Sequence, residues 1–306
     1  MGTVDQAISS LEGRWATSGA SDGLPICPPT GSAVEEMLAG GLPGETILAP
    51  LPPGMQPLRV VEVATCAVMA GCRAGVLPIV LAALAGVSSP EFNLLGVSTT
   101  TGNAAVGLIV HGDAAVDAGI TGGGNCLGPT PASNAAIGRA VAVCLRLLAG
   151  AVPGGLDMAT LGQPSKYGLC LTEAALPDGW LPLHAERGVT SGSAVTVFAS
   201  SGILEIADAS ARTGDELVAT LAAAVALPTA LGHTGSGGGH HIVLLPPEWA
   251  ARMAADGWTR SAIAHHLCEH AVLPLECVPA HLRPLLPDGE IRFARSPDEF
   301  LFPVAG

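Results

Sequence analysis

Residues 57–87, PLRVVEVATCAVMAGCRAGVLPIVLAALAGV, are the part of the sequence that most limits the folds open to this chain. Their apolar side chains recur at helical spacing, and a glycine at position 71 interrupts them. The pattern predicts two helices that meet near Gly71, with Cys72 at the start of the second. The longest strongly apolar stretch, residues 76–87, contains a proline and is far shorter than the roughly 18–20 residues of a membrane span. We therefore expect a buried helix pair and no membrane partner.

The composition limits the core and the partners. Hydrophobic residues make up 49% of the 306 residues but aromatic residues only 3%, so the core must consist of closely packed Ala, Val, Leu and Ile side chains. Twenty-six acidic residues against 13 basic ones give a formal net charge of -13, which argues against a nucleic-acid partner. The amino terminus has no basic segment followed by an apolar one. We expect a cytoplasmic protein whose eight cysteines are reduced.

Glycine, proline and apolar periodicity divide the chain into three segments, and the predicted fold class is α/β. The segments are a Pro/Gly-rich amino-terminal arm, a first α/β unit and a second α/β unit, at residues 1–56, 57–190 and 191–306. Strands are predicted at 92–101, 105–112 and 240–247, and a strand or hairpin at 193–208. Further helices are predicted at 132–151, 213–227 and 247–274. The windows 69–82 and 254–267 match in spacing. This match allows two related α/β units with paired helices packed on small sheets.

The glycine-rich segment GITGGGNCLGPTPAS leads into the helix predicted at 132–151. Thr130 is expected as its N-cap and Pro131 as its first residue. Backbone N–H groups at such a helix start can bind a carboxylate or the phosphate of a cofactor, although the segment has no GxGxxG or GxxxxGK(S/T) motif and an ordinary connection has the same composition. The helical spacing turns Arg139 and Arg146 away from the apolar stripe.

Cys72 is the candidate nucleophile. A thiol at a helix amino terminus and beside a cation, here Arg73, has a lowered pKa and a larger thiolate fraction. Cys66 precedes it by six residues, which is close enough for a redox pair. The alternative is a small buried hydrophobic residue, as most free cysteines are.

The single lysine and the single tyrosine of the chain are adjacent, as Lys166 and Tyr167. A desolvated lysine can form a Schiff base or bind an anion, and a tyrosine can donate a proton. A surface lysine beside a packed tyrosine would do neither. Downstream, His184 and Glu186 would point to one side of an extended segment and Arg187 to the other. They are candidates for acid–base chemistry, and a solvated charged turn is the alternative.

Six of the nine histidines lie in the segments HTGSGGGHH and HHLCEH. His266 and His270 are four residues apart on one helical face, a spacing that can chelate zinc. A third ligand would be His240 from the glycine-rich segment, or Cys268. The sequence has no HExxH motif, and surface histidines on a loop and an amphipathic helix are the alternative.

Four segments occur in the order AVMAGC, SNAAIGRAV, LGQPSKYGLC and PLHAERG. They resemble the motifs MAGCRPE, ANxxIGRA, GxPGKY and PLHVERG of a poorly characterised bacterial family associated with UGSC-motif proteins, in which U is selenocysteine or cysteine takes its place. The resemblance covers about residues 57–275. It implies functional roles for Cys72, Arg73, Asn134, Arg139, Lys166, Tyr167, Glu173, His184, Glu186 and Arg187.

The chain departs from this family pattern at two places. Ala74 and Gly75 stand where the family has Pro-Glu, and TEAAL, with Glu173 alone, stands where the family has an ENEE cluster. Acidic groups that could serve as a base or ligand are therefore missing. The chain also lacks UGSC, so chemistry that needs this motif would come from another subunit.

From these residues we expect a cysteine-dependent, lyase-like enzyme or catalytic subunit without a cofactor. It would act on a small anionic metabolite, by cleavage or addition at a carbon that bears a heteroatom. Catalysis would use Cys72, Lys166, His184 and Glu186, and substrate contacts would come from Arg73, Asn134, Arg139, Tyr167, Glu173 and Arg187. Two alternatives remain open: a zinc enzyme with His240, His266 and His270 as ligands, and a non-catalytic partner subunit of a thiol or selenol protein. A homo-oligomer is compatible with each.

Overall fold

The computed structural model describes residues 2–17, 19–129, 132–232, 241–281, 283–285 and 290–306. The chain forms two compact units, each with its own core. The first consists of residues 1–172 and 188–203, and the second of residues 173–187 and 204–306. Both contain helices and small sheets, so the predicted α/β class is confirmed. That the two units are related stays a prediction.

The first unit is mainly helical, with one sheet of three strands and one of two. Its helices are α1 (Thr3–Thr17), α2 (Gly31–Leu38), α3 (Val60–Met69), α4 (Leu77–Val87), α5 (Leu94–Thr99), α6 (Asp113–Asp117) and α7 (Ala132–Leu147). Its strands are β1 (Ile47–Leu48), β2 (Leu58–Arg59), β3 (Ala105–His111), β4 (Cys170–Leu171) and β5 (Ala194–Ser200). The short 3-10 turns are η1 (Pro90–Phe92) and η2 (Pro164–Lys166).

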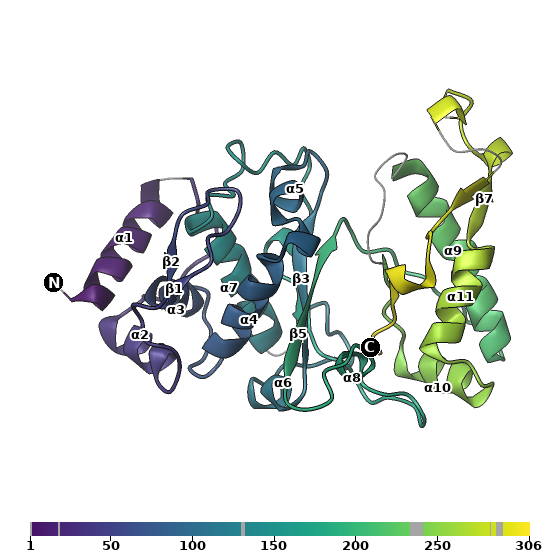
Figure 1. The fold of residues 1–306 in the computed structure, drawn as a ribbon, viewed down its shortest axis with the longest axis horizontal. Coiled ribbons are helices and arrows are strands. Elements are labelled where there is room, and N and C mark those ends of the chain that lie inside the picture. Colours follow the sequence, from purple (N-terminus) through teal and green to yellow (C-terminus); the bar gives the residue numbers. More distant parts are fainter. Residues whose placement is uncertain (1, 18, 130–131, 233–240, 282, 286–289) are drawn as a thin grey trace. The chain divides into compact units, whose positions relative to one another are not determined.

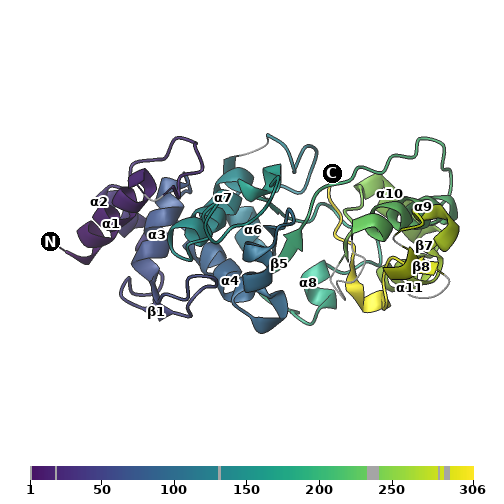
Figure 2. The ribbon, with the colours of Figure 1, turned by 90° about the horizontal axis from the view of Figure 1, so that it is seen from above.

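The predicted helix pair forms the centre of this unit. Nine of the ten residues of α3 are buried, and Pro78 occupies the first turn of α4, where a missing N–H costs nothing. Figures 1 and 2 show the layers: α1 and α2 pack on α3, α3 packs on α4 and α7, and α4 and α7 pack on the sheet. The core consists mainly of Ala, Val, Leu and Ile, as the scarcity of aromatic residues predicts.

Among the described residues, no single helix is both long and apolar enough to cross a membrane. α4 and the segment Pro90–Thr99 are together long and apolar enough, but the chain bends by 71° between them. Most of α4 is buried inside the unit.

The sheet has β3 at its centre. β4 pairs with it in parallel, with Leu108 opposite Cys170, and β5 pairs with it antiparallel over seven residues. β5 is a single strand, so the predicted strand at 193–208 ends earlier than expected. The strand predicted at 92–101 is wrong, because these residues form η1 and α5. Asn93 adopts a left-handed conformation there, and its side chain accepts a hydrogen bond from the Gly96 N–H, which begins the helix.

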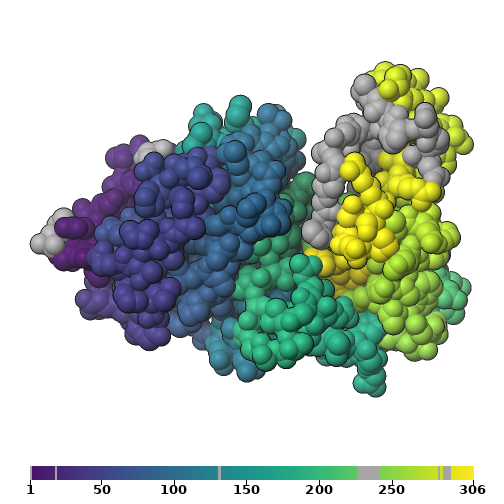
Figure 3. All heavy atoms as spheres, in the orientation of Figure 1, coloured from purple at the N-terminus to yellow at the C-terminus, as the bar shows by residue number. Residues whose placement is uncertain are grey.

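Residues 1–56 belong to the core of the first unit, whereas the sequence predicts a separate arm. Ala7 and Leu11 of α1 and Val34 and Met37 of α2 are buried in the same core as α3. In the space-filling view of Figure 3, the purple amino-terminal residues pack directly against the blue part of the unit. The division of the chain falls after Thr172 and not at the predicted boundaries.

The second unit contains four helices and two small sheets. They are α8 (Leu183–Glu186), α9 (Gly214–Gly232), α10 (Pro247–Ala255), α11 (Arg260–His270), β6 (His241–Ile242), β7 (Val272–Pro274), β8 (Glu290–Arg292) and β9 (Phe300–Leu301), with the 3-10 turns η3 (Leu275–Cys277), η4 (Arg283–Leu285) and η5 (Pro297–Glu299). β6 pairs in parallel with β9, and β7 pairs antiparallel with β8. The helix pair predicted at 247–274 is confirmed as α10 and α11. The strand predicted at 240–247 is only the two-residue β6.

Both helix pairs use the same cap at the turn between their helices. Gly71 follows α3 with φ +89°, and Gly257 follows α10 with φ +87°, a left-handed conformation that glycine adopts without strain. The next N–H bonds back to the carbonyl five residues earlier, from Cys72 to Ala67 at 3.0 Å and from Trp258 to Met253 at 2.9 Å. This is the Schellman C-cap, and it explains the matching windows in the sequence.

Candidate functional site

Cys72 lies at the carboxyl end of α3 and not at the start of α4, so the predicted position is wrong. Gly71 ends the first helix as its cap, and α4 begins only at Leu77. The carboxyl end of a helix carries the negative end of the helix dipole, which does not stabilise a thiolate. The sequence-based reason for expecting a reactive Cys72 thiolate is therefore removed.

The surroundings of Cys72 raise its pKa, whereas the sequence predicts a lowered pKa. Burial and the neighbouring Cys27 raise the pKa of Cys72 to about 12, and the guanidinium of Arg139 lowers it less than these raise it. Cys72 is half-buried and is a protonated thiol at neutral pH. The cation that interacts with it is Arg139, and the predicted Arg73 is exposed and donates to the Asp117 carbonyl at 3.1 Å.

Five of the eight cysteines gather around this point, although the sequence separates them by up to 143 positions, from 27 to 170. Cys72 interacts electrostatically with Cys27, Cys144 and Cys170. A hydrogen bond with Cys66, together with burial, raises the pKa of Cys144, and burial raises that of Cys170 to about 12. All five are free thiols. The buried partner of Cys66 is thus Cys144, whereas the sequence suggested a pair with Cys72.

Two glycines allow α7, which carries Cys144, to cross the chain before β4, which carries Cys170, at backbone contact. A Cβ atom on Gly138 would lie 2.6 Å from the backbone nitrogen of Leu169, and one on Gly168 would lie even closer to the backbone nitrogen of Arg139. No other residue fits at either position. The crossing brings Arg139 of α7 beside Cys72. Three segments of the family resemblance, around residues 72, 138 and 168, therefore meet in the first unit.

Arg139 holds the chain before α2 and keeps part of its guanidinium available. Its Nε and Nη2 donate to the Asp22 carboxylate at 2.8 and 3.1 Å, and Nη2 also donates to the Leu24 carbonyl at 3.4 Å. Nη1 makes no hydrogen bond within the described residues. Arg146 lies on the same side of α7 and donates to the Ala20 and Ser21 carbonyls, as its spacing from Arg139 predicts.

Asn134 supports the glycine-rich segment from inside. It is 3% exposed; its Oδ1 accepts from the Thr121 N–H at 2.9 Å, and its Nδ2 donates to the carbonyls of Thr121 and Cys126 at 2.9 and 3.3 Å. Its amide is thus used within the protein, and a substrate contact would require these bonds to break. The predicted cap at Thr130 and Pro131 lies outside the described residues.

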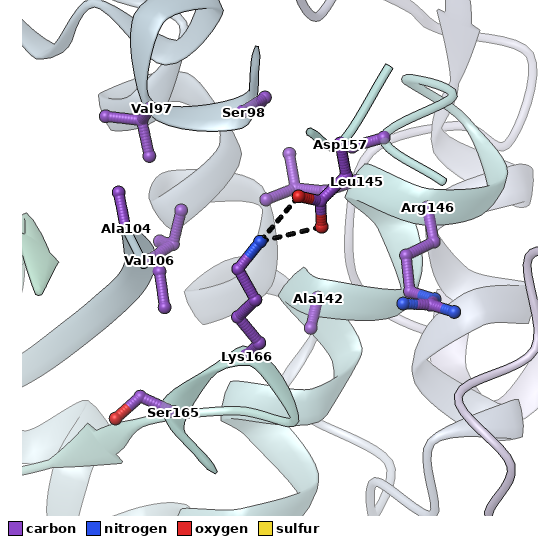
Figure 4. A pocket seen from close by; sticks show the side chains of 12 residues that line it. Val97, Ser98, Ala104, Val106, Ala142, Leu145, Arg146, Asp157, Ser165 and Lys166 are labelled. Carbon is purple, nitrogen blue, oxygen red and sulfur yellow. Dashed lines mark hydrogen bonds and ion pairs between the residues drawn. The ribbon is translucent and has the colours of Figure 1, made fainter. Parts of the chain in front are cut away.

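Lys166 occupies a small cavity of about 60 Å³ beside α7, which Figure 4 shows. Its Nζ donates to both oxygens of Asp157 at 2.7 Å. The lining also includes Val97, Ser98, Ala104, Ala105, Val106, Ala142, Leu145, Arg146, Ala151 and Ser165. Such a volume holds a few water molecules and is far below the roughly 300–1,000 Å³ of a ligand pocket. Cys72 does not line this cavity, and the Tyr167 side chain is exposed to solvent.

In the second unit, Glu173 and Glu186 are counterions of Arg260, a residue that sequence reasoning missed. Arg260 is 6% exposed; its Nη2 lies 2.7 Å from Glu173 Oε1, and its Nη1 lies 3.0 Å from Glu186 Oε1. Its Nε donates to the Phe302 carbonyl at 2.8 Å, and the guanidinium stacks 5.0 Å over the ring of Trp180. No motif or residue spacing in the sequence indicates this contact, because Arg260 and Glu173 lie 87 positions apart.

His184 belongs to a helical turn, so the predicted extended arrangement of His184 and Glu186 is wrong. The turn is α8, and its Leu183 N–H donates to Glu173 Oε2 at 2.7 Å. Glu186, the predicted partner of His184, is bound to Arg260 instead. Arg187 follows the turn and is exposed.

The proposed zinc ligands are described only in part. The His266 and His270 rings stack with centroids 4.1 Å apart, and His270 Nδ1 lies 3.0 Å from the His266 carbonyl. His240 lies outside the described residues. In the described part of the chain, no third His, Cys, Asp or Glu ligand atom joins this pair. Zinc binding stays a prediction.

Comparisons with known proteins identify no relative of this chain. Neither a protein-family model, nor a curated protein, nor a solved structure matches this chain. The resemblance to the UGSC-associated family stays a prediction based on the four segments. The function must be inferred from the geometry of the residues themselves.

Proposed function

We propose that the chain is a thiol-dependent, lyase-like enzyme in which Cys72 reacts with a small anionic metabolite. The observation that carries the proposal is the pairing of a half-buried thiol with a cation that has unused donors: Cys72 interacts with Arg139, whose Nη1 makes no hydrogen bond within the described residues. A carboxylate could be held by this nitrogen while a neighbouring carbon faces the sulfur.

The raised pKa of Cys72 limits the chemistry. A thiol that is protonated at neutral pH is a poor nucleophile by itself, so its proton must leave in the same step as the attack. Addition of S–H across a carbonyl satisfies this: sulfur bonds to the carbon, the π electrons move to oxygen, and the thiol proton ends on that oxygen. The reverse step releases the substrate. A 2-oxo acid carries both the carbonyl and the carboxylate that Arg139 would bind.

The other predicted catalytic residues have a smaller part in this proposal. Lys166 is bound to Asp157 by both carboxylate oxygens, and Glu186 is bound to Arg260. Neither is available as a proton carrier without losing its partner. We therefore assign the thiol to Cys72 and the anion contact to Arg139, and give Lys166 and Glu186 structural roles.

Two alkylating agents of equal size test this assignment. Iodoacetate carries a carboxylate and iodoacetamide does not, so a cation beside Cys72 favours iodoacetate relative to iodoacetamide. We expect the ratio of the two rates at Cys72, followed by peptide mass spectrometry, to be several-fold higher than at Cys277, an exposed cysteine of the second unit. Arg139→Gln should bring the ratio at Cys72 down to that of Cys277. Equal ratios in the unaltered protein would refute the anion contact.

Turnover is tested with a panel of small 2-oxo acids. A substrate should protect Cys72, but not Cys277, from iodoacetamide, and Cys72→Ser should abolish its conversion while circular dichroism remains unchanged. Conversion that survives Cys72→Ser would rule out the proposed nucleophile.

The non-catalytic partner subunit is the second candidate, and the raised pKa of Cys72 favours it. A thiol that is never deprotonated would serve only packing. In that case Cys72 would resist both alkylating agents at neutral pH, and no 2-oxo acid would alter its labelling.

A further inference from the structure

Cys27 lies at the same end of α3 as Cys72. Its backbone N–H donates to the Met69 carbonyl at 3.1 Å, and its Sγ would lie 3.5 Å from a Cβ atom on Gly71, the residue that precedes Cys72. The two sulfurs also interact electrostatically. The sulfur of Cys27 is therefore within van der Waals distance of a side-chain position next to Cys72.

The segment that carries Cys27 is anchored to the same helix that contacts Cys72. Arg139 of α7 binds the Asp22 carboxylate, and Arg146 binds the carbonyls of Ala20 and Ser21. With the Leu24 carbonyl, which also accepts from Arg139, the two arginines bind four of the five residues 20–24. Cys27 is thus held at the end of α3 by contacts other than its own side chain.

Exposure decreases in steps from Cys27 to the buried cysteines. Cys27 is exposed, Cys72 is intermediate, and Cys66, Cys144 and Cys170 are buried. A disulfide reagent from solution can reach Cys27 first, and from there only Cys72 is both near and partly accessible. The buried pair Cys66 and Cys144 is closed to a reagent of that size.

We propose that Cys27 and Cys72 form a reversible disulfide that blocks the reactive thiol, an inference that rests on the proposed function of Cys72. The Cys27 thiolate attacks glutathione disulfide, which forms a mixed disulfide and releases one glutathione thiolate. Cys72 then loses its proton to solvent and attacks the Cys27 sulfur, which releases the second glutathione. Two thiols are oxidised, and one glutathione disulfide is reduced to two glutathione molecules.

The second step is the slow one. Only the thiolate attacks a disulfide, and the pKa of Cys72 is raised to about 12. The mixed disulfide at Cys27 should therefore accumulate first, and its conversion to the Cys27–Cys72 disulfide should speed up about tenfold for each pH unit between pH 7 and pH 9.

Peptide mapping without reduction tests the proposal on the full chain. After incubation with glutathione disulfide we expect a peptide pair linked through Cys27 and Cys72, which dithiothreitol removes. Cys27→Ser and Cys72→Ser should each abolish it, and Cys277→Ser, at another exposed cysteine, should leave it unchanged. The proposal is overturned if the map shows the mixed disulfide of Cys27 with glutathione and no protein disulfide, or a disulfide from Cys27 to a cysteine other than Cys72. Circular dichroism of each variant controls for folding.

The same samples separate this proposal from the proposed function. If the disulfide forms but iodoacetate shows no preference for Cys72, the disulfide stands and the anion contact fails. If Cys27→Ser keeps the iodoacetate preference at Cys72 while the unaltered protein forms no disulfide, the anion contact stands and the disulfide proposal fails.

Discussion

Replacing Arg260 by methionine should destabilise the second unit by about 3–5 kcal/mol, because it leaves a buried carboxylate without its counterion. The side chains of Arg260 and Glu173 are only 5% and 7% exposed, and their charged atoms are 2.7 Å apart. Methionine replaces the aliphatic part of the arginine side chain but lacks the guanidinium and its charge, so it cannot compensate Glu173. Glu186, of which 33% is exposed, can turn to water and should contribute little to the loss.

The partners of Arg260 determine which variants isolate the ion pair. Glu173→Gln keeps a hydrogen-bond acceptor and leaves Arg260 with Glu186 and the Phe302 carbonyl, so its cost should be smaller, about 2 kcal/mol. The double variant Arg260→Met with Glu173→Gln removes both charges together. It should be more stable than Arg260→Met alone, because it no longer buries a carboxylate that has lost the charge of Arg260.

Urea unfolding followed by tryptophan fluorescence measures this loss in the second unit. Three of the four tryptophans of the chain belong to that unit, namely Trp180, Trp249 and Trp258. With a slope of roughly 2 kcal/mol per M urea, a loss of about 4 kcal/mol lowers the midpoint by about 2 M. Arg295→Met, at an exposed arginine, is the matched control. A shift for Arg260→Met no larger than that of Arg295→Met would refute the reasoning.

Three further predictions concern the first unit. Gly138→Ala should lower the thermal midpoint strongly, because its Cβ would lie 2.6 Å from a backbone nitrogen, whereas Gly124→Ala, with nothing within 4 Å, should not; equal shifts would contradict the close crossing. The pKa of Cys72 is raised from 9.0 to about 12, so its stabilising contribution is full below pH 9 and is lost as pH rises from 9 to 12. Because the pKa values of Cys144 and Cys170 are raised too, urea unfolding of the unaltered protein is compared with that of Cys72→Ser across this range; identical profiles would contradict the contribution of Cys72. Asp22→Asn leaves the charge of Arg139 unopposed, so iodoacetamide should label Cys72 several-fold faster at pH 8; an unchanged rate would mean that Arg139 does not control the thiol.

Local patterns in the sequence were sufficient for most of the helices. Apolar spacing predicted α3, α4 and α7, and it also predicted the helix pair α10 and α11. The failure at 92–101 has a physical reason: its β-branched residues favour a strand, but the left-handed Asn93 provides a helix cap that the apolar pattern does not display. Tertiary and cap interactions decide such short segments, and they are weakly encoded in periodicity.

The candidate site was predictable in its residue types and not in its contacts. Gly71 is recognisable as a helix boundary, yet the same glycine can precede a new helix or end the old one, and only the C-cap bonds decide between them. The cation of Cys72 was expected one residue away, at Arg73, and is instead Arg139, which a backbone crossing at Gly138 brings close. Contacts between residues so distant in sequence depend on the whole packing of the unit.

The scarcity of cations restricts where an anionic substrate could bind in this chain. Only 13 of the 306 residues are Lys or Arg, and the structure uses several of them internally. Arg260 binds two carboxylates and backbone carbonyls, Lys166 binds the Asp157 carboxylate, and Arg146 donates to two backbone carbonyls. A carboxylate that displaced any of these would break an existing partner contact. Arg139 differs from these three in that its charge acts on Cys72. In the proposed function, substrate binding and thiol chemistry would therefore share Arg139.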